Sequence, residues 1–201
     1  QIQRSTGMKD SWEKAKVEVP AERWADLSQD DFGVSLLNRS KYGYDIKGNT
    51  IRLSLLRSPK WPDPTADRGK HVIEYALYPH KGRINEAQTV ERGYEYNNPL
   101  IVYQTDSHPG ELPPVHSFVR ITPASLILTS IKQAEDSKAW MIQWYDSKGE
   151  ETNAVVTLPQ TPKKMVQSNF LEEDGESVVF EKNVVKFHTR KNSVVTLKAY
   201  F

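Results

Sequence analysis

The feature that most constrains the fold of this chain is a long succession of short β-forming runs separated by turn residues. The runs are rich in Val, Ile, Leu and Tyr, and they continue through almost the whole sequence. This spacing is typical of a β-sandwich and predicts an all-β fold. The expected strands are 16–19, 32–37, 50–56, 71–78, 100–104 and 117–121, followed by 126–131, 140–145, 154–158, 178–181, 184–188 and 194–200.

One expected strand shows which of its faces is buried. Trp140, Ile142 and Trp144 alternate with other side chains along 140–145, so one face of this strand can carry two indoles into a sandwich core. The segment 84–94 differs, because its apolar residues recur at helical spacing with charged residues between them. We therefore expect one short amphipathic helix, docked on a sheet.

Prolines mark a division of the chain into two domains. The stretch 110–114 contains two prolines, and Thr122-Pro123 follows before the β pattern restarts, with six expected strands in the remaining residues. Proline stops the backbone from extending a sheet, so we place the domain boundary near residue 122. The expected domains are 1–122 and 123–201.

Composition excludes several classes of protein. The net charge is +1, and the charged residues, 26% of the total, are interspersed, so neither nucleic acid nor a membrane surface is an expected partner. The chain has no cysteine, which excludes disulfides and thiolate metal sites and fits the reducing cytosol. No apolar stretch reaches the roughly 20 residues of a membrane span. Because the first residue is Gln1, we expect the chain to be a piece of a longer polypeptide.

Candidate chemical groups are sparse when the residues are taken alone. The five histidines lack the spacing of a zinc site, so we interpret them as surface or hydrogen-bonded side chains. Asp26, Asp30 and Asp31 lie near Trp24 and suit either a sugar site or a turn, and the turn is favoured. The histidines are His71, His80, His108, His116 and His188.

A proline-rich loop between two expected strands is a further candidate. Residues 61–69 form a loop of the length that often borders a ligand. The guanidinium of Arg68 could donate hydrogen bonds to sugar hydroxyls. The residues alone favour the alternative, an arginine at a loop tip in solvent.

Several strings of residues, in order, match a known family. The first hundred residues resemble the family 38 α-mannosidases of the glycoside hydrolases, in particular their bacterial and cytosolic branch. From Pro123 onward, 131–136 and 169–172 resemble the small terminal β domain of the same family, more loosely. The matching strings in the first half are 1–6, 11–19, 23–28, 33–38, 41–45, 53–59, 62–64, 67–69 and 75–80.

This resemblance implies a fold for the chain and a catalytic site that lies elsewhere in the enzyme. Residues 1–122 would be the last part of the large central β-sandwich (super-sandwich) domain of a retaining α-mannosidase, and 123–201 its small C-terminal β-sandwich. In the family, an aspartate nucleophile and a zinc ion lie on an N-terminal barrel, so this chain would contain no catalytic residue and no metal site. The implied partners are that catalytic domain in the same polypeptide and a mannose-containing oligosaccharide. The implied location is the cytoplasm, and the oligomeric state is left open.

The resemblance also suggests residues that contact substrate. In some family members an arginine on a loop of the β region reaches the sugar, and Arg68 in 67–69 is the best match to it. Tyr42 and Tyr44 are the second candidates, at the rim of the pocket. Core packing or a hairpin tip is an equally good interpretation of both tyrosines.

Two rival functions remain. A stand-alone carbohydrate-binding module would need exposed aromatic residues arranged as a platform, and an interaction scaffold would need no sugar contact. The excised-fragment interpretation expects Trp12, Trp24 and Trp61 to be buried and an apolar sheet face to lie open to solvent. The tryptophans that could build a platform are Trp12, Trp24, Trp61, Trp140 and Trp144.

Overall fold

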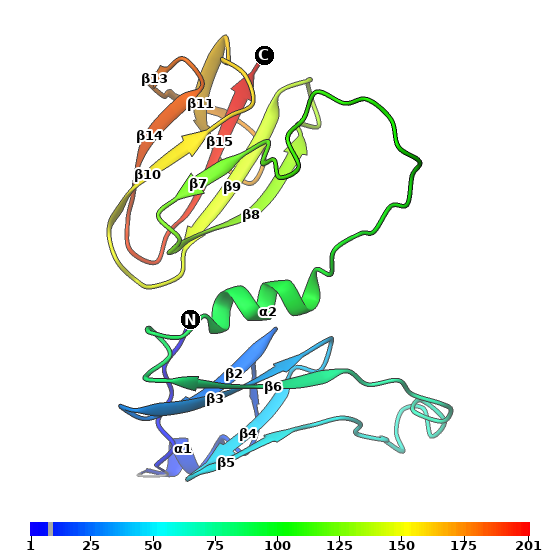
Figure 1. Cartoon of the computed structure of the whole chain (residues 1–201). Coiled ribbons are helices and arrows are strands. Elements are labelled where there is room, and N and C mark those ends of the chain that lie inside the picture. Colours follow the sequence, from blue (N-terminus) through cyan, green and yellow to red (C-terminus); the bar gives the residue numbers. More distant parts are fainter. Residues whose placement is uncertain (8–9) are drawn as a thin grey trace. The chain divides into compact units, whose positions relative to one another are not determined.

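The computed structural model describes residues 1–7 and 10–201, which form two compact units, 2–105 and 106–201 (Figure 1). Most of the elements are strands, as the sequence predicts. The N-terminal unit contains α1 (Ser11–Ala15), β1 (Val19–Pro20), β2 (Trp24–Ser28), β3 (Phe32–Asn38), β4 (Gly43–Lys47), β5 (Thr50–Leu53), β6 (Tyr75–Lys81) and α2 (Thr89–Asn97).

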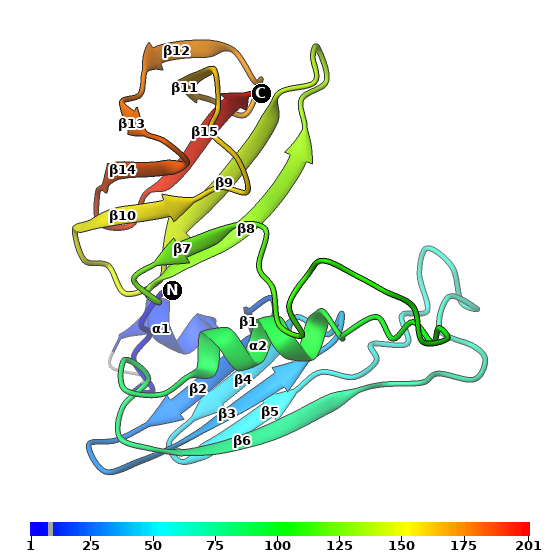
Figure 2. The same ribbon diagram turned by 45° about the horizontal axis from the view of Figure 1, so that its top comes forward.

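The N-terminal unit is built from two antiparallel three-stranded sheets, ordered β1-β4-β5 and β2-β3-β6. The sheets pack against each other through a small core of Ala25, Leu36 and Tyr44. Side chains alternate along a strand, so Trp24 and Ser35 point to the opposite face of β2-β3-β6. This opposite face carries α2, which runs across β2 and β3 (Figure 2).

Part of the sandwich face of the β2-β3-β6 sheet is uncovered. Leu77 pairs with Leu36 in register and therefore points to the same face as this core residue, as does Tyr75 two positions earlier. Leu77 is nevertheless 67% exposed and Tyr75 54% exposed. β6 is also an edge strand in this unit. The expected solvent-facing apolar sheet is therefore present on the β6 side.

The C-terminal unit is a small sandwich of a four-stranded sheet, β13-β14-β10-β7, and a five-stranded sheet, β12-β11-β15-β9-β8. The ribbon shows these sheets as two layers (Figure 1). The strands are β7 (Arg120–Thr122), β8 (Leu126–Gln133), β9 (Trp140–Asp146), β10 (Thr152–Thr157), β11 (Lys164–Ser168), β12 (Asp174–Ser177), β13 (Phe180–Glu181), β14 (Val184–Thr189) and β15 (Val194–Tyr200).

The core of the C-terminal sandwich surrounds the indole of Trp144, as the sequence predicts. Trp144 is fully buried, and its Nε1 donates a hydrogen bond to Thr189 Oγ1 at 3.0 Å. Trp140 is half-buried against the same cluster and meets the ring of Phe201 edge-on. The prediction that one face of β9 carries two indoles inward is confirmed. The fully buried side chains around Trp144 are Ile142, Ala154, Val156, Val185, Leu197 and Ala199.

Some predicted elements differ from the observed ones. The expected strand 100–104 is not formed within the described residues, where 100–104 carry neither helix nor strand. The expected helix 84–94 begins later, at Thr89, because 84–86 form a turn. The one-turn helix α1 was not expected, and neither were the strands β2, β4, β11 and β12. All residues of β12 are exposed and most of them are polar. The sequence of β12 therefore lacks the alternation of apolar and polar residues from which a strand is predicted.

The connection between the units lies before the predicted boundary, because Thr122 is the last residue of β7 in the C-terminal unit. The compact units divide between residues 105 and 106, and 98–119 contain no helix or strand. β7 pairs with β10 and so belongs to the C-terminal sheet, although the sequence places its residues in the first domain. The boundary near 122 remains a prediction about the family's domain division.

No helix among residues 1–7 and 10–201 is long and apolar enough to cross a membrane.

Candidate functional site

The candidate residues of the N-terminal unit lie at one end of its two sheets. The backbone N–H of Ser54, just after β5, donates to Gly43 O at 2.9 Å, and the N–H of Arg39 donates to Glu74 O, just before β6, at 3.2 Å. The guanidinium of Arg39 also pairs with the Glu74 carboxylate at 2.9 Å. Both ends of the segment 54–74 are therefore fixed beside the β3–β4 connection. We call this the loop end of the unit.

The segment 54–74 folds on itself as it leaves the loop end. Asp63 accepts hydrogen bonds from the hydroxyl (2.7 Å) and backbone N–H (2.8 Å) of Thr65, and these bonds lower its pKa. The Asp67 carboxylate accepts from the N–H of Ser58 at 2.6 Å and so closes the loop. These bonds hold the loop by short-range contacts and leave its outer side chains free to meet a partner.

Arg68 lies on this loop with its side chain exposed. Its backbone N–H donates to Thr65 O at 3.0 Å, which fixes the position of its Cα. Within residues 1–7 and 10–201, its guanidinium makes no hydrogen bond or ion pair. The five N–H donors of this group are therefore available to an outside acceptor.

Tyr42 lies at the loop end, just before β4, and is 54% exposed. It borders a hollow of about 200 Å³. This volume is below the roughly 300–1,000 Å³ of a typical small-molecule pocket, so the hollow cannot enclose an oligosaccharide. The residues that line it are Glu22, Arg23, Tyr42, Asn97 and Asn98.

Tyr44 occupies a different environment from Tyr42. It has no exposed surface, and its hydroxyl accepts from Asn38 Nδ2 at 2.6 Å and donates to Leu36 O at 3.1 Å. Burial raises the pKa of its hydroxyl, while the bond from Asn38 acts in the opposite sense. The expectation that Tyr44 lines a pocket rim is corrected, because its side chain is enclosed by the core on every side.

A buried polar network beneath α2 was not predicted from the sequence. Asp26 Oδ2 lies 2.6 Å from His80 Nε2 and accepts from the Ser35 hydroxyl at 2.7 Å. The Ser35 hydroxyl also lies 2.7 Å from the hydroxyl of Thr89, the first residue of α2. This network ties the start of α2 to β2, β3 and β6. Asp30 and Asp31 instead form the β2–β3 turn, as the favoured interpretation predicted.

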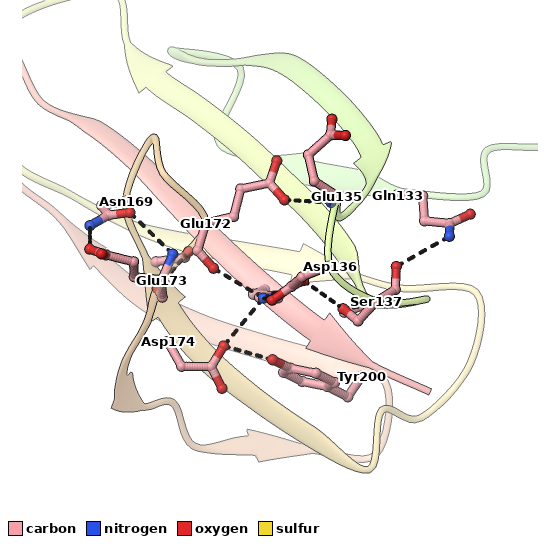
Figure 3. Close-up of polar contacts among 12 residues, drawn as sticks. Gln133, Glu135, Asp136, Ser137, Asn169, Glu172, Glu173, Asp174 and Tyr200 are labelled. Carbon is pink, nitrogen blue, oxygen red and sulfur yellow. Dashed lines mark hydrogen bonds and ion pairs between the residues drawn. The ribbon is translucent and has the colours of Figure 1, made fainter.

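A second charged cluster lies in the C-terminal unit, where the β8–β9 and β11–β12 turns meet β15. The Lys198 side chain is 2% exposed, and its ammonium donates to both oxygens of Asp136 and to Glu172 O, each at 3.0 Å. Figure 3 shows Asp136, Asp174 and Tyr200 converging at this point. Burial disfavours the charged ammonium, but the bonds to Asp136 and Tyr200 outweigh it and raise the pKa of Lys198.

The carboxylates of this cluster are unsuited to acid catalysis. Hydrogen bonds from Lys164 and Tyr200 lower the pKa of Asp174 to about 2, and the bond from Lys198 lowers the pKa of Asp136. A glycosidase needs one carboxylic acid with a raised pKa to protonate the leaving group. These carboxylates stay ionised and paired, so the cluster is structural.

The described parts of the chain, 1–7 and 10–201, contain no group of three His, Cys, Asp or Glu side chains placed to hold a metal ion. His80 is taken up by the Asp26 network.

The three tryptophans of the first half differ in their exposure to solvent. Trp12 on α1 is 73% exposed and Trp61 on the 54–74 loop is 84% exposed. Trp24 is half-buried beneath α2, where a Cβ on Gly93 would lie 2.7 Å from its Cδ1. The expectation that all three are buried is therefore wrong for Trp12 and Trp61.

The fold defines the chain as two β-sandwich units, and comparison with known proteins specifies the family to which they belong. Residues 1–65 match the glycosyl hydrolases family 38 C-terminal domain, and residues 125–200 match the family 38 C-terminal beta sandwich domain. The chain belongs to the C-terminal region of glycosyl hydrolase family 38.

Individual relatives agree with this placement. Alpha-mannosidase G of Dictyostelium discoideum is 39% identical over 180 residues, which cover 88% of this chain and 17% of that protein. Alpha-mannosidase 2C1 of Mus musculus is 42% identical over 152 residues, which cover 74% of this chain and 14% of that protein. The chain therefore spans about one sixth of the length of these relatives.

Among solved structures, an alpha-mannosidase from Enterococcus faecalis V583 superposes with a TM-score of 0.78 at 18% identity. The match covers 100% of this chain and 23% of that one. It shows that the fold is shared.

Proposed function

We propose that this chain is the non-catalytic C-terminal β region of a retaining α-mannosidase that removes terminal, non-reducing α-D-mannose residues. The observation that carries the proposal is the pair of family matches, one in each unit, together with the similarity of the chain to two α-mannosidases. The catalytic barrel would lie elsewhere in the full polypeptide. Its two carboxyl groups would stand about 5 Å apart, as retention requires.

The chemistry of the charged clusters in this chain is consistent with a non-catalytic role. The carboxylates of the Lys198 cluster are held ionised, and the buried Asp26 is bonded to His80 and Ser35. None of these groups resembles the acid of a glycosidase pair. The zinc ion that the family resemblance implies would be held by the barrel, where it would bind and orient the hydroxyls of the mannose.

The loop end supplies the candidate contacts with substrate. Arg68 offers unpaired donors on a loop that is fixed at both ends, and Tyr42 offers an exposed ring at the same end of the unit. We propose that this end faces the sugar-binding pocket and that Arg68 donates to hydroxyls of the bound glycan. The substrate would be a mannose-containing oligosaccharide, and the absence of cysteine fits a cytoplasmic enzyme.

The test is an assay of the full polypeptide. We expect it to release mannose from an aryl α-mannoside with retention of configuration, which NMR of the first-formed anomer would detect. We also expect the activity to be lost when zinc is chelated. Zinc should restore the activity. A full polypeptide that leaves α-mannosides intact but cleaves another glycoside would overturn the proposed substrate class.

A carbohydrate-binding module is the second candidate, because Trp12 and Trp61 are both strongly exposed. Exposed indoles stack on sugar rings. This candidate predicts that Trp12→Ala or Trp61→Ala weakens retention of the full polypeptide on immobilised mannan without changing hydrolysis of a small aryl mannoside. Unchanged retention in both variants would remove it.

A further inference from the structure

The segment that follows α2 exposes a continuous run of apolar side chains. Leu100, Ile101, Val102 and Tyr103 are 95%, 98%, 90% and 87% exposed. In the part of the chain that the structure describes, no strand or helix includes them. Proteins rarely leave a contiguous apolar run open to water, so this segment has the character of an interface.

The order of side chains shows what kind of interface it is. In an extended backbone, Leu100 and Val102 point to one face, and Ile101 and Tyr103 point to the other. Both faces are therefore apolar, and 98–104 carry no charge. A strand of this kind is buried on both faces, as in the interior of a layered sheet. A partner that covers one face, such as a single docked helix, would leave the other face in water.

The segment leaves the N-terminal unit at the loop end. Asn97 Nδ2, at the end of α2, donates to Asn38 O at 3.0 Å, and the guanidinium of Arg39 donates to Tyr96 O at 2.7 Å. These residues adjoin the roots of the 54–74 loop, which also carries exposed apolar side chains, among them Trp61. Two apolar segments therefore emerge from the same end of this unit.

We infer that residues 100–104 form a strand buried within the portion of the family 38 polypeptide that lies outside this chain. The inference rests on the proposed function, because it requires the longer enzyme. Relatives that share this region are about five times as long as this chain, so most of the polypeptide is available to receive the segment. A second copy is a poorer occupant, because two such segments would form a two-stranded ribbon with both faces exposed.

The partner that this surface fits is an apolar sheet with an open strand position. Main-chain hydrogen bonds to the neighbouring strands would provide the pairing, and layers on both sides would cover the four side chains. The segment would then tie the C-terminal β region to the rest of the enzyme, beside the loop that carries Arg68.

Site-specific photo-crosslinking in the full polypeptide tests this inference. Tyr103 is replaced by p-benzoylphenylalanine, another large aromatic residue, and the crosslinked peptides are identified by mass spectrometry. The control carries the same group at Ser107, an exposed position four residues further on. We expect Tyr103 to give one dominant crosslink to a peptide outside residues 1–201, at least about tenfold more abundant than any crosslink from Ser107.

Three outcomes would overturn the inference: a crosslink within residues 1–201, a crosslinked dimer of two copies, or no crosslink above the Ser107 control. Each variant is also assayed on an aryl α-mannoside. An active enzyme without the expected crosslink would reject the strand and leave the proposed function standing. The expected crosslink in a polypeptide without mannosidase activity would reject the proposed function alone.

Discussion

At the scale of single residues, Arg68 is the side chain through which this chain would touch substrate. In the full polypeptide we expect Arg68→Ala to raise KM for a mannose oligosaccharide about tenfold with kcat unchanged, because a charge-assisted hydrogen bond to the bound sugar is lost. Arg57→Ala is the control, since Arg57 is exposed on the same segment. Identical kinetics for the two variants would place Arg68 in solvent.

Asp174 provides a pH prediction. Hydrogen bonds from Lys164 and Tyr200 lower its pKa from 3.8 to about 2 in the folded state. Its folded pKa lies below the unfolded value, so its stabilisation is fully present above pH 3.8 and is lost as the pH falls through about 2. We expect Asp174→Asn to lower the free energy of unfolding of the C-terminal unit at pH 7 and to change it little near pH 2.

Denaturant titrations at several pH values measure this effect. Glu176→Gln is the matched control, because Glu176 is an exposed carboxylate on the same strand, β12. The account of the Lys198 cluster fails if both variants show the same dependence of stability on pH.

The two tyrosine candidates show that the sequence alone could not tell a buried side chain from an exposed one. Tyr42 and Tyr44 stand two positions apart in the same short motif, and residue type alone makes them equal candidates. The fold separates them, because Tyr44 enters the core beneath β3 while Tyr42 precedes β4 and stays exposed. Arg68 could be assigned to a loop from its proline-rich neighbours, but the hydrogen bonds that close this loop could not be predicted.

At the scale of elements, α2 depends on a close approach to the sheet. A Cβ on Gly93 would lie 2.7 Å from Trp24 Cδ1, too close for two carbon atoms. Alanine normally stabilises a helix by about 1 kcal/mol relative to glycine. Here we expect Gly93→Ala to destabilise the N-terminal unit by about 1–3 kcal/mol, because α2 must move away from β2.

Thermal or chemical denaturation of the N-terminal unit measures this change. Glu95→Ala, on the exposed side of α2, should stay within about 0.5 kcal/mol of the parent. A Gly93→Ala variant that is more stable than the parent would contradict the packing described for α2.

Strands with a regular apolar pattern were predictable from sequence, and those without one were not. β9 and β15 supply the centre of the C-terminal core and carry strong patterns. β12 lies at a sheet edge with all its residues exposed, so its pairing with β11 depends on the tertiary fold. Residues 100–104 differ from β12 in the opposite sense. Their sequence strongly favours a β-strand, but within the described residues they form none.

At the scale of the whole molecule, the two units differ in how complete they are. The C-terminal sandwich encloses its own core around Trp144. The N-terminal unit leaves Tyr75 and Leu77 exposed beside an edge of β6 that pairs with no other strand of the described residues. The family could be recognised from ordered strings of sequence, whereas the compact division between residues 105 and 106 arises from contacts that no local pattern reveals.

The central claim is that this chain completes a mannosidase without containing its chemistry. The most direct measurement is the rate of mannose release from an aryl α-mannoside by the 201-residue chain alone, with its β structure confirmed by circular dichroism and with zinc or another divalent ion supplied. The account predicts no release above the blank, while the full polypeptide turns over under the same conditions. Turnover by the isolated chain would contradict it.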